Sequence, residues 1–174
     1  MTILKTIGID LNTHQRYKIH VNNKLIQKYF LNEWEKNLQM HGDGKLCSYV
    51  LLKNNFGREG YLSIVKSFEK RSRLTRLRVS AHSLRIEKGR HQGIPRHDRT
   101  CTRCSSGEVE DEVHFILKCK SLDSARNKLI KCIEQNCPNF KELSDQNKFI
   151  WLMNNENREI LYELCTFIND NENH

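Results

Sequence analysis

The sequence contains few residues that interrupt helices and no long apolar run. Its 174 residues include only 2 prolines and 8 glycines, a composition that favours a chain built mainly of helices. No stretch of about 18 consecutive apolar residues occurs, and the amino-terminal residues lack the apolar core of a secretory signal. We therefore expect no association with a membrane, and we expect the protein to work in the nucleus or cytoplasm.

Apolar residues recur at helical spacing along most of the chain, so the sequence predicts a mainly α-helical fold. This spacing is found in residues 21–40, 61–84, 121–135, 149–153 and 158–168. The apolar run 46–52 fits a strand or a buried helical turn equally well, and the glycines and proline of 89–98 predict a loop. We expect four segments: an amino-terminal helical segment at 1–44, a basic helical region at 45–100, a zinc-binding motif at 101–119 and carboxy-terminal helices at 120–174.

Three of the seven cysteines and one histidine lie within nineteen residues. The candidate ligands are Cys101, Cys104, His114 and Cys119, with two, nine and four residues between them. In a reducing compartment such a cluster is typical of a metal site rather than of disulfides, and Zn²⁺ takes four thiolate or imidazole ligands in a tetrahedron. Gly107 would let the chain reverse between the two pairs, and the acidic residues 110–112 would begin the helix that carries the histidine. We predict one structural Zn²⁺ whose ligand set is closed; thiols that cluster by chance remain the alternative.

The other cysteines and one histidine are interpreted as structural. Cys132 and Cys137 have no further ligands near them in the sequence, and Cys47 and Cys165 fall in apolar runs, so we expect buried or partly buried thiols. We expect His82 to be a structural histidine rather than a ligand.

Positive charge is concentrated in the first hundred residues. They contain 20 lysines and arginines against 8 acidic residues, whereas residues 101–174 contain 9 against 13. Residues 70–99 alone hold ten basic and two acidic residues, and most of the basic ones are arginine, which donates two hydrogen bonds to phosphate at once. We predict contacts to an RNA or DNA backbone from Lys70, Arg71, Arg73, Arg76, Arg78, Arg85, Arg90 and Arg96. A solvated helix face with a few salt bridges is the alternative.

Three motifs follow one another in this part of the chain. They are LTRLRVSAHSLRIEKGR at 74–90, PRHDRTCTRC at 95–104 and VEDEVHFILKC at 109–119. Together they resemble the carboxy-terminal zinc-binding region of reverse transcriptases from Jockey-like non-LTR retrotransposons. The flanks at 45–62 and 149–168 are also similar, so the resemblance covers about residues 45–168. A proline often follows the last ligand in that family, whereas Lys120 stands here, which has no consequence for zinc binding.

The resemblance implies a terminal fragment of a reverse transcriptase rather than a working polymerase. Polymerase chemistry needs paired aspartates that hold two metal ions, and the chain contains no Asp-Asp pair. In the parent polyprotein, such a region would help to hold the template during target-primed reverse transcription. We therefore predict a non-catalytic protein that binds zinc and nucleic acid, with the rest of that polyprotein as a further partner. The alternative is a zinc-stabilised protein–protein interaction module.

Overall fold

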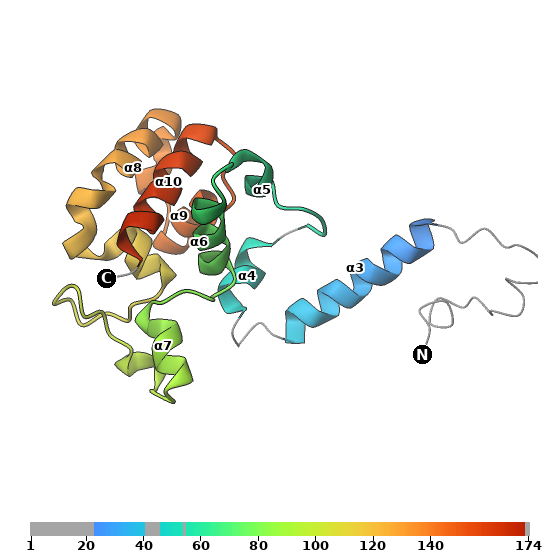
Figure 1. Cartoon of the computed structure of the whole chain (residues 1–174), viewed down its shortest axis with the longest axis horizontal. Coiled ribbons are helices and arrows are strands. Elements are labelled where there is room, and N and C mark those ends of the chain that lie inside the picture. Colours follow the sequence, from blue (N-terminus) through green and yellow to red (C-terminus); the bar gives the residue numbers. More distant parts are fainter. Residues whose placement is uncertain (1–22, 41–45, 54, 173–174) are drawn as a thin grey trace, which may run out of the picture. The chain divides into compact units, whose positions relative to one another are not determined.

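The computed structural model describes residues 23–40, 46–53 and 55–172, and it divides the chain into two compact units (Figure 1). The units comprise residues 1–44 and 45–174. In the first unit, α3 (Asn23–Met40) confirms the predicted helix from residue 23 onward; the first two residues of that prediction lie outside the described ranges. Leu25 and Phe30 of α3 are 46% and 41% exposed.

The second unit consists of helices and helical turns. They are α4 (Cys47–Leu52), α5 (Tyr61–Ile64), α6 (Phe68–Arg78), α7 (Arg85–His91), η1 (Arg96–Asp98), η2 (His114–Lys118), η3 (Lys120–Leu122), α8 (Asp123–Asn136), η4 (Pro138–Glu142), α9 (Asp145–Met153) and α10 (Arg158–Asn171). Within the described ranges there is no strand, only an isolated antiparallel bridge between Thr100 and Val109. The predicted mainly helical fold is therefore confirmed, and the ambiguous run at 46–52 is helical.

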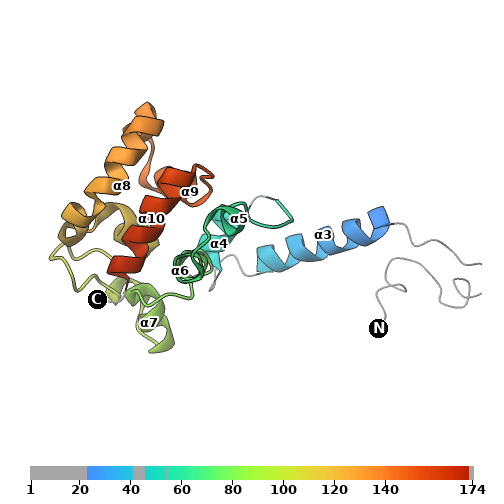
Figure 2. The same ribbon diagram turned by 45° about the horizontal axis from the view of Figure 1, so that its top comes forward.

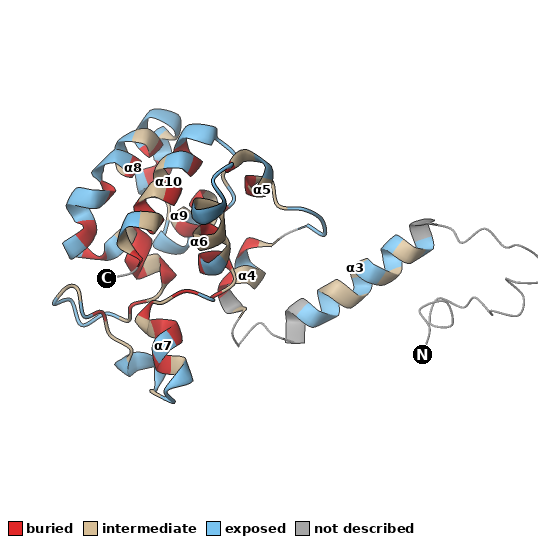
Figure 3. Cartoon of the chain, in the orientation of Figure 1, coloured by how far each residue is buried: buried red, intermediate tan, exposed pale blue. Residues whose placement is uncertain are grey.

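The core of this unit forms around α10, which packs against both α6 and α8 (Figures 1 and 2). Leu164 and Ile168 of α10, Leu77 of α6 and Ile133 of α8 are all fully buried. Buried residues lie where these helices face one another, whereas the outer faces are exposed (Figure 3). The helical spacing of the apolar residues in each segment produces this one-sided burial.

Polar side chains fix where three of these helices begin. The Ser67 hydroxyl accepts a hydrogen bond from a main-chain N–H in the first turn of α6, and Ser144 does the same for α9. The side chain of Asn157 accepts from the main-chain N–H of Glu159 at 2.8 Å at the start of α10. A side-chain acceptor at this position satisfies main-chain donors that the helix itself leaves free, and each cap stabilises its helix by about 1 kcal/mol.

A turn at residues 79–84 separates α6 from α7, where the apolar spacing predicted a continuing helix. Ser80 has φ +50°, and its hydroxyl donates to Glu112 at 2.9 Å, so a contact from a distant segment fixes the turn. Ala81 is exposed rather than part of a buried stripe. The predicted loop at 89–98 begins later than expected because α7 continues to His91.

Candidate metal centre

A short antiparallel hairpin carries the first two candidate ligands. The main-chain N–H of Cys101 donates to the carbonyl of Glu108 at 2.8 Å, and that of Glu110 donates to Arg99 at 3.0 Å. Gly107 has φ +72°, a conformation that side chains disfavour, and it lies where the chain reverses, as predicted. The hairpin thereby holds Cys101 and Cys104 beside the helical turn that follows.

The other two candidate ligands lie on a widened helical turn. The Asp111 carboxylate accepts a hydrogen bond from the main-chain N–H of His114 at 2.9 Å and so caps the turn. The main-chain N–H of Cys119 then donates to the carbonyl of His114 at 2.8 Å, a bond between residues five apart. On an α-helix, residues five apart point about 140° away from each other, whereas the wider π-turn brings them toward one side. The π-turn therefore explains why four residues separate His114 from Cys119 in the sequence.

The guanidinium of Arg126 stabilises this turn from α8. It donates to the carbonyl of Ile116 at 2.6 Å and to that of Cys119 at 3.0 Å, and the arginine is only 4% exposed. Because a π-turn leaves carbonyls without their usual helical donors, Arg126 replaces those donors with its own N–H groups. Sequence reasoning missed this residue, and its only local signal is Asp123, three positions earlier, which pairs with it at 2.6 Å.

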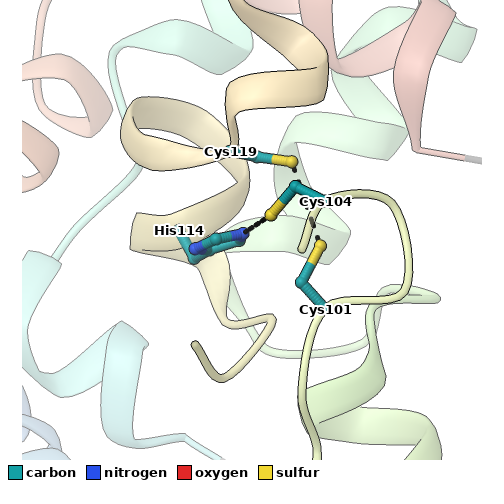
Figure 4. Close-up of side chains that lie close together, drawn as sticks. All are labelled: Cys101, Cys104, His114 and Cys119. Carbon is teal, nitrogen blue, oxygen red and sulfur yellow. Dashed lines mark hydrogen bonds between the residues drawn. The ribbon is translucent and has the colours of Figure 1, made fainter. Parts of the chain in front are cut away.

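The structure brings the four predicted ligands together (Figure 4). Their ligand atoms all lie within 4.8 Å of one another. Cys101 Sγ and Cys119 Sγ are 3.9 Å apart, and Cys104 Sγ and His114 Nε2 are 3.4 Å apart. A tetrahedron with ordinary zinc bond lengths has edges of about 3.8 Å between two sulfurs and about 3.6 Å between sulfur and nitrogen. The cluster can hold one metal ion, and its four protein ligands complete a tetrahedral shell.

A carboxylate orients the histidine of the cluster. His114 Nδ1 donates to Glu108 Oε2 at 3.0 Å, which leaves Nε2 as the nitrogen that faces the cysteines. Lys118 Nζ donates to the other oxygen of Glu108 at 2.8 Å, and this bond, followed by that from His114, lowers the pKa of Glu108. Such a carboxylate–histidine pair is typical of metal sites because it fixes the ring and its tautomer.

The thiols of the cluster differ in their ease of ionisation. Burial, together with the charge of Cys101, raises the pKa of Cys119 to about 12. The Ser106 hydroxyl lowers the pKa of the more exposed Cys104 to about 6. Thiolates that are buried without a counter-charge are unfavourable. A bound cation would take the place of the thiol protons and offset the negative charge of the sulfurs.

Two buried glutamates of the motif bind the turn between α6 and α7. Glu110 is 4% exposed and accepts from the main-chain N–H of Arg85 at 2.8 Å. Glu112 is 5% exposed and accepts from Ser80 and from Nε2 of His82, each at 2.9 Å. His82 is thus a structural histidine, as interpreted. The alternation of Glu108, Glu110 and Glu112 was the signal for these contacts, which sequence reasoning overlooked.

Arg78, one of the eight predicted phosphate contacts, lies in the core. It is 1% exposed, and its guanidinium donates to the carbonyl of Met153 and to Glu59 at 2.9 Å. It also lies 3.3 Å from Asn154 Oδ1. The prediction for Arg78 is wrong because its guanidinium is buried and both of its terminal nitrogens bond to internal acceptors.

Most of the other predicted contacts also have partners within the protein. Arg71 donates to the carbonyl of Val65 at 3.0 Å, Lys70 to Thr166 at 2.7 Å and Arg90 to Glu87 at 2.7 Å, while Arg73 lies 3.7 Å from Glu172. Arg85 is half-buried. Arg76 is exposed, and the side chain of Arg96 is 62% exposed and 3.7 Å from Asp111. The arginine-rich segment is therefore largely part of the protein's internal packing.

Comparisons with models of protein families, with curated proteins and with solved structures gave no match. Within the described ranges, no helix is both long and apolar enough to span a bilayer.

Proposed function

We propose that the chain is a non-catalytic module that binds one structural Zn²⁺ and, through its exposed cations, the phosphate backbone of a nucleic acid. The choice of zinc rests on the donor set, because three thiolates and one imidazole in a tetrahedron are a usual zinc environment. The closed shell leaves no position for a substrate or a water, so the metal would have no catalytic role.

The observation that supports nucleic-acid binding is the placement of charge in residues 46–172. The carboxylates beside the metal cluster form hydrogen bonds or ion pairs with other residues of the protein. They are those of Glu108, Glu110, Asp111 and Glu112. Several exposed lysines and arginines, by contrast, have no carboxylate within 4 Å among the described residues. They are Arg58, Lys66, Arg76, Lys88, Lys120, Lys128, Lys131 and Arg158. Exposed unpaired cations on a basic chain attract polyanions, with an affinity that falls as salt rises.

The proposed relation to the end of a retrotransposon reverse transcriptase rests on the linked motifs. The contacts between them support it: Ser80 and His82 of the first motif bind Glu112 of the third. The residues on which the resemblance rests therefore contact one another in the fold. A polymerase reading frame directly upstream of the codon for Met1 is the genomic observation that tests this relation.

Metal content tests the zinc proposal. We expect one zinc ion per chain by mass spectrometry of the intact protein under native conditions. Cys119→Ser should lose the ion, whereas Cys137→Ser, which changes a thiol outside the cluster, should keep it. Zinc binding contributes on the order of 10–16 kcal/mol in zinc-finger peptides, so a chelator should unfold at least residues 95–125. A Cys101→Ser protein that retained its zinc and its circular dichroism spectrum would refute the proposal.

Binding of the intact protein to labelled RNA and DNA tests the second half of the proposal. Fluorescence anisotropy should show binding at 50 mM salt that weakens steeply by 200 mM, because phosphate contacts release counterions. Absence of binding to single strands and duplexes alike at 50 mM salt would leave the interaction module as the function.

A further inference from the structure

A groove with cations from several elements lies on the second unit, away from the metal cluster. It runs between the connection of α5 to α6 on one side and α8 and α10 on the other, and its volume is about 810 Å³. Apolar side chains form part of its lining, among them Ile64, Val65, Leu161 and Cys165. The volume of the groove is therefore in the range of ligand-binding sites, and its lining is partly apolar.

The positive charges of this groove come from different elements and are largely unpaired. Lys66 approaches from the connection before α6, Lys128 and Lys131 from α8, and Arg158 from the first turn of α10. All four are exposed and have no carboxylate within 4 Å among the described residues. Lys128 and Lys131 are three residues apart on one helix, where like charges repel each other. A ligand with regularly spaced negative charges would relieve this repulsion along the groove.

Tyr162 adds an aromatic surface to the same groove. Its side chain belongs to a residue that is 60% exposed, and Lys70 Nζ lies 4.3 Å from the centre of its ring. Cationic grooves with exposed aromatic rings are the usual way in which proteins bind single-stranded nucleic acid, with phosphates on the cations and a base on the ring.

Two carboxylates in the lining distinguish a nucleotide chain from an acidic peptide. Glu159 and Glu163 of α10 also line the groove. They would repel the side-chain carboxylates of an acidic peptide, whose only donors toward them are its main-chain N–H groups. A nucleotide chain also carries base amino groups and, in RNA, ribose hydroxyls, which donate hydrogen bonds to carboxylates.

We propose that this cationic groove, rather than the arginine-rich segment, binds a single strand of RNA or DNA. The phosphates lie against Lys66, Lys128 and Lys131, and one base stacks on Tyr162. This inference rests on the proposed nucleic-acid binding and assigns it a place and a preference for single strands.

The test measures the affinity of the intact zinc-loaded protein for fluorescein-labelled oligo(dT), oligo(U) and a DNA duplex of matched length. The first variant is Lys128→Ala/Lys131→Ala, which removes two groove cations that have no internal partner. Loss of two phosphate contacts should reduce the slope of log affinity against log salt by about 1.4, and it should weaken binding about 25-fold at 0.1 M salt. The control is Lys36→Ala/Lys141→Ala, which also removes two exposed lysines but ones that lie outside the groove and are paired with Glu33 and Glu134; it should change affinity less than threefold.

Tyr162→Ala supplies a readout that charge alone does not move. It should weaken single-strand binding at least fivefold and leave the salt slope unchanged, because stacking of one base is lost while the phosphate contacts remain. Zinc content and circular dichroism establish that each variant is folded.

Four results would overturn the inference. Equal losses in the groove variant and the control would show that the cations act together as a diffuse field, so nucleic-acid binding would stand and the groove would not. Tighter binding to the duplex than to either single strand would have the same meaning. Binding of a labelled oligo-glutamate peptide as tight as that of oligo(dT) would assign the groove to an acidic protein segment. Absence of any nucleic-acid binding by the unaltered protein would remove the proposed function together with the groove.

Discussion

Replacing Arg78 by alanine should destabilise the second unit strongly, although sequence composition places this arginine among the solvent-facing cations. The change removes the hydrogen-bond donors to the Met153 carbonyl and to the Glu59 carboxylate. Both bonds are made by an arginine that is only 1% exposed. It also removes the guanidinium that lies 5.0 Å from the centre of the Tyr61 ring. Breaking a buried ion pair by removing one partner costs about 3–5 kcal/mol. Lys53 stays 2.7 Å from Glu59 and continues to compensate its charge, so we expect a value near the lower end, about 3 kcal/mol.

Urea unfolding followed by circular dichroism measures this loss, with the metal kept in excess. For a chain of this size, about 3 kcal/mol corresponds to a fall in melting temperature of roughly 6–12 °C. Arg76→Ala is the control, because it removes an exposed arginine from the same helix and should change stability by less than about 0.5 kcal/mol. An Arg78→Ala protein within about 1 kcal/mol of the unaltered one would refute the buried placement of this arginine.

Two further predictions concern the metal site and the core. Glu108→Ala should weaken zinc binding about 10–100-fold in competition with a chromophoric chelator, because it removes the acceptor that orients His114; Glu134→Ala removes an equally exposed carboxylate elsewhere and should have no effect. Burial raises the pKa of Cys165 to about 12, so at pH 8 it is a neutral thiol within the core, and iodoacetamide should label it only after denaturation. Labelling of the native protein at Cys165, detected by peptide mass spectrometry, would contradict the packing of α10.

The helices of the carboxy-terminal half were predictable because local signals and packing agree there. In α8, Leu129 and Ile133 repeat at helical spacing and are both buried. The end of α6 was not predictable in this way, because Ser80 and His82 leave the helical path to bind Glu112, some thirty residues later in the chain. The spacing of apolar residues indicates which face of a helix is buried, but it gives no information about a partner as distant in sequence as Glu112.

The four residues of the candidate metal cluster could be predicted because thiols and imidazoles at close spacing have few other roles. The turn that holds two of them could not, since the donors of Arg126 come from the next helix and the need for them arises only when the turn widens. The charge on the arginine-rich segment was overinterpreted for a related reason. Counting charges does not reveal which of them meet main-chain carbonyls inside the fold.

Main-chain carbonyls accept hydrogen bonds from four arginines: Arg78, Arg99, Arg103 and Arg126. These bonds restrict which substitutions the sequence can accept during evolution. A lysine offers its donors from a single point and cannot reach two separate acceptors as the planar guanidinium does. Exchange of arginine for lysine should therefore be rare at these four positions, whereas groove residues such as Lys128 should accept either. Descendants of this sequence would keep these four arginines whether or not they bind a nucleic acid. Conservation of positive charge at the groove lysines, rather than conservation of these arginines, would then indicate whether selection has maintained the proposed nucleic-acid binding.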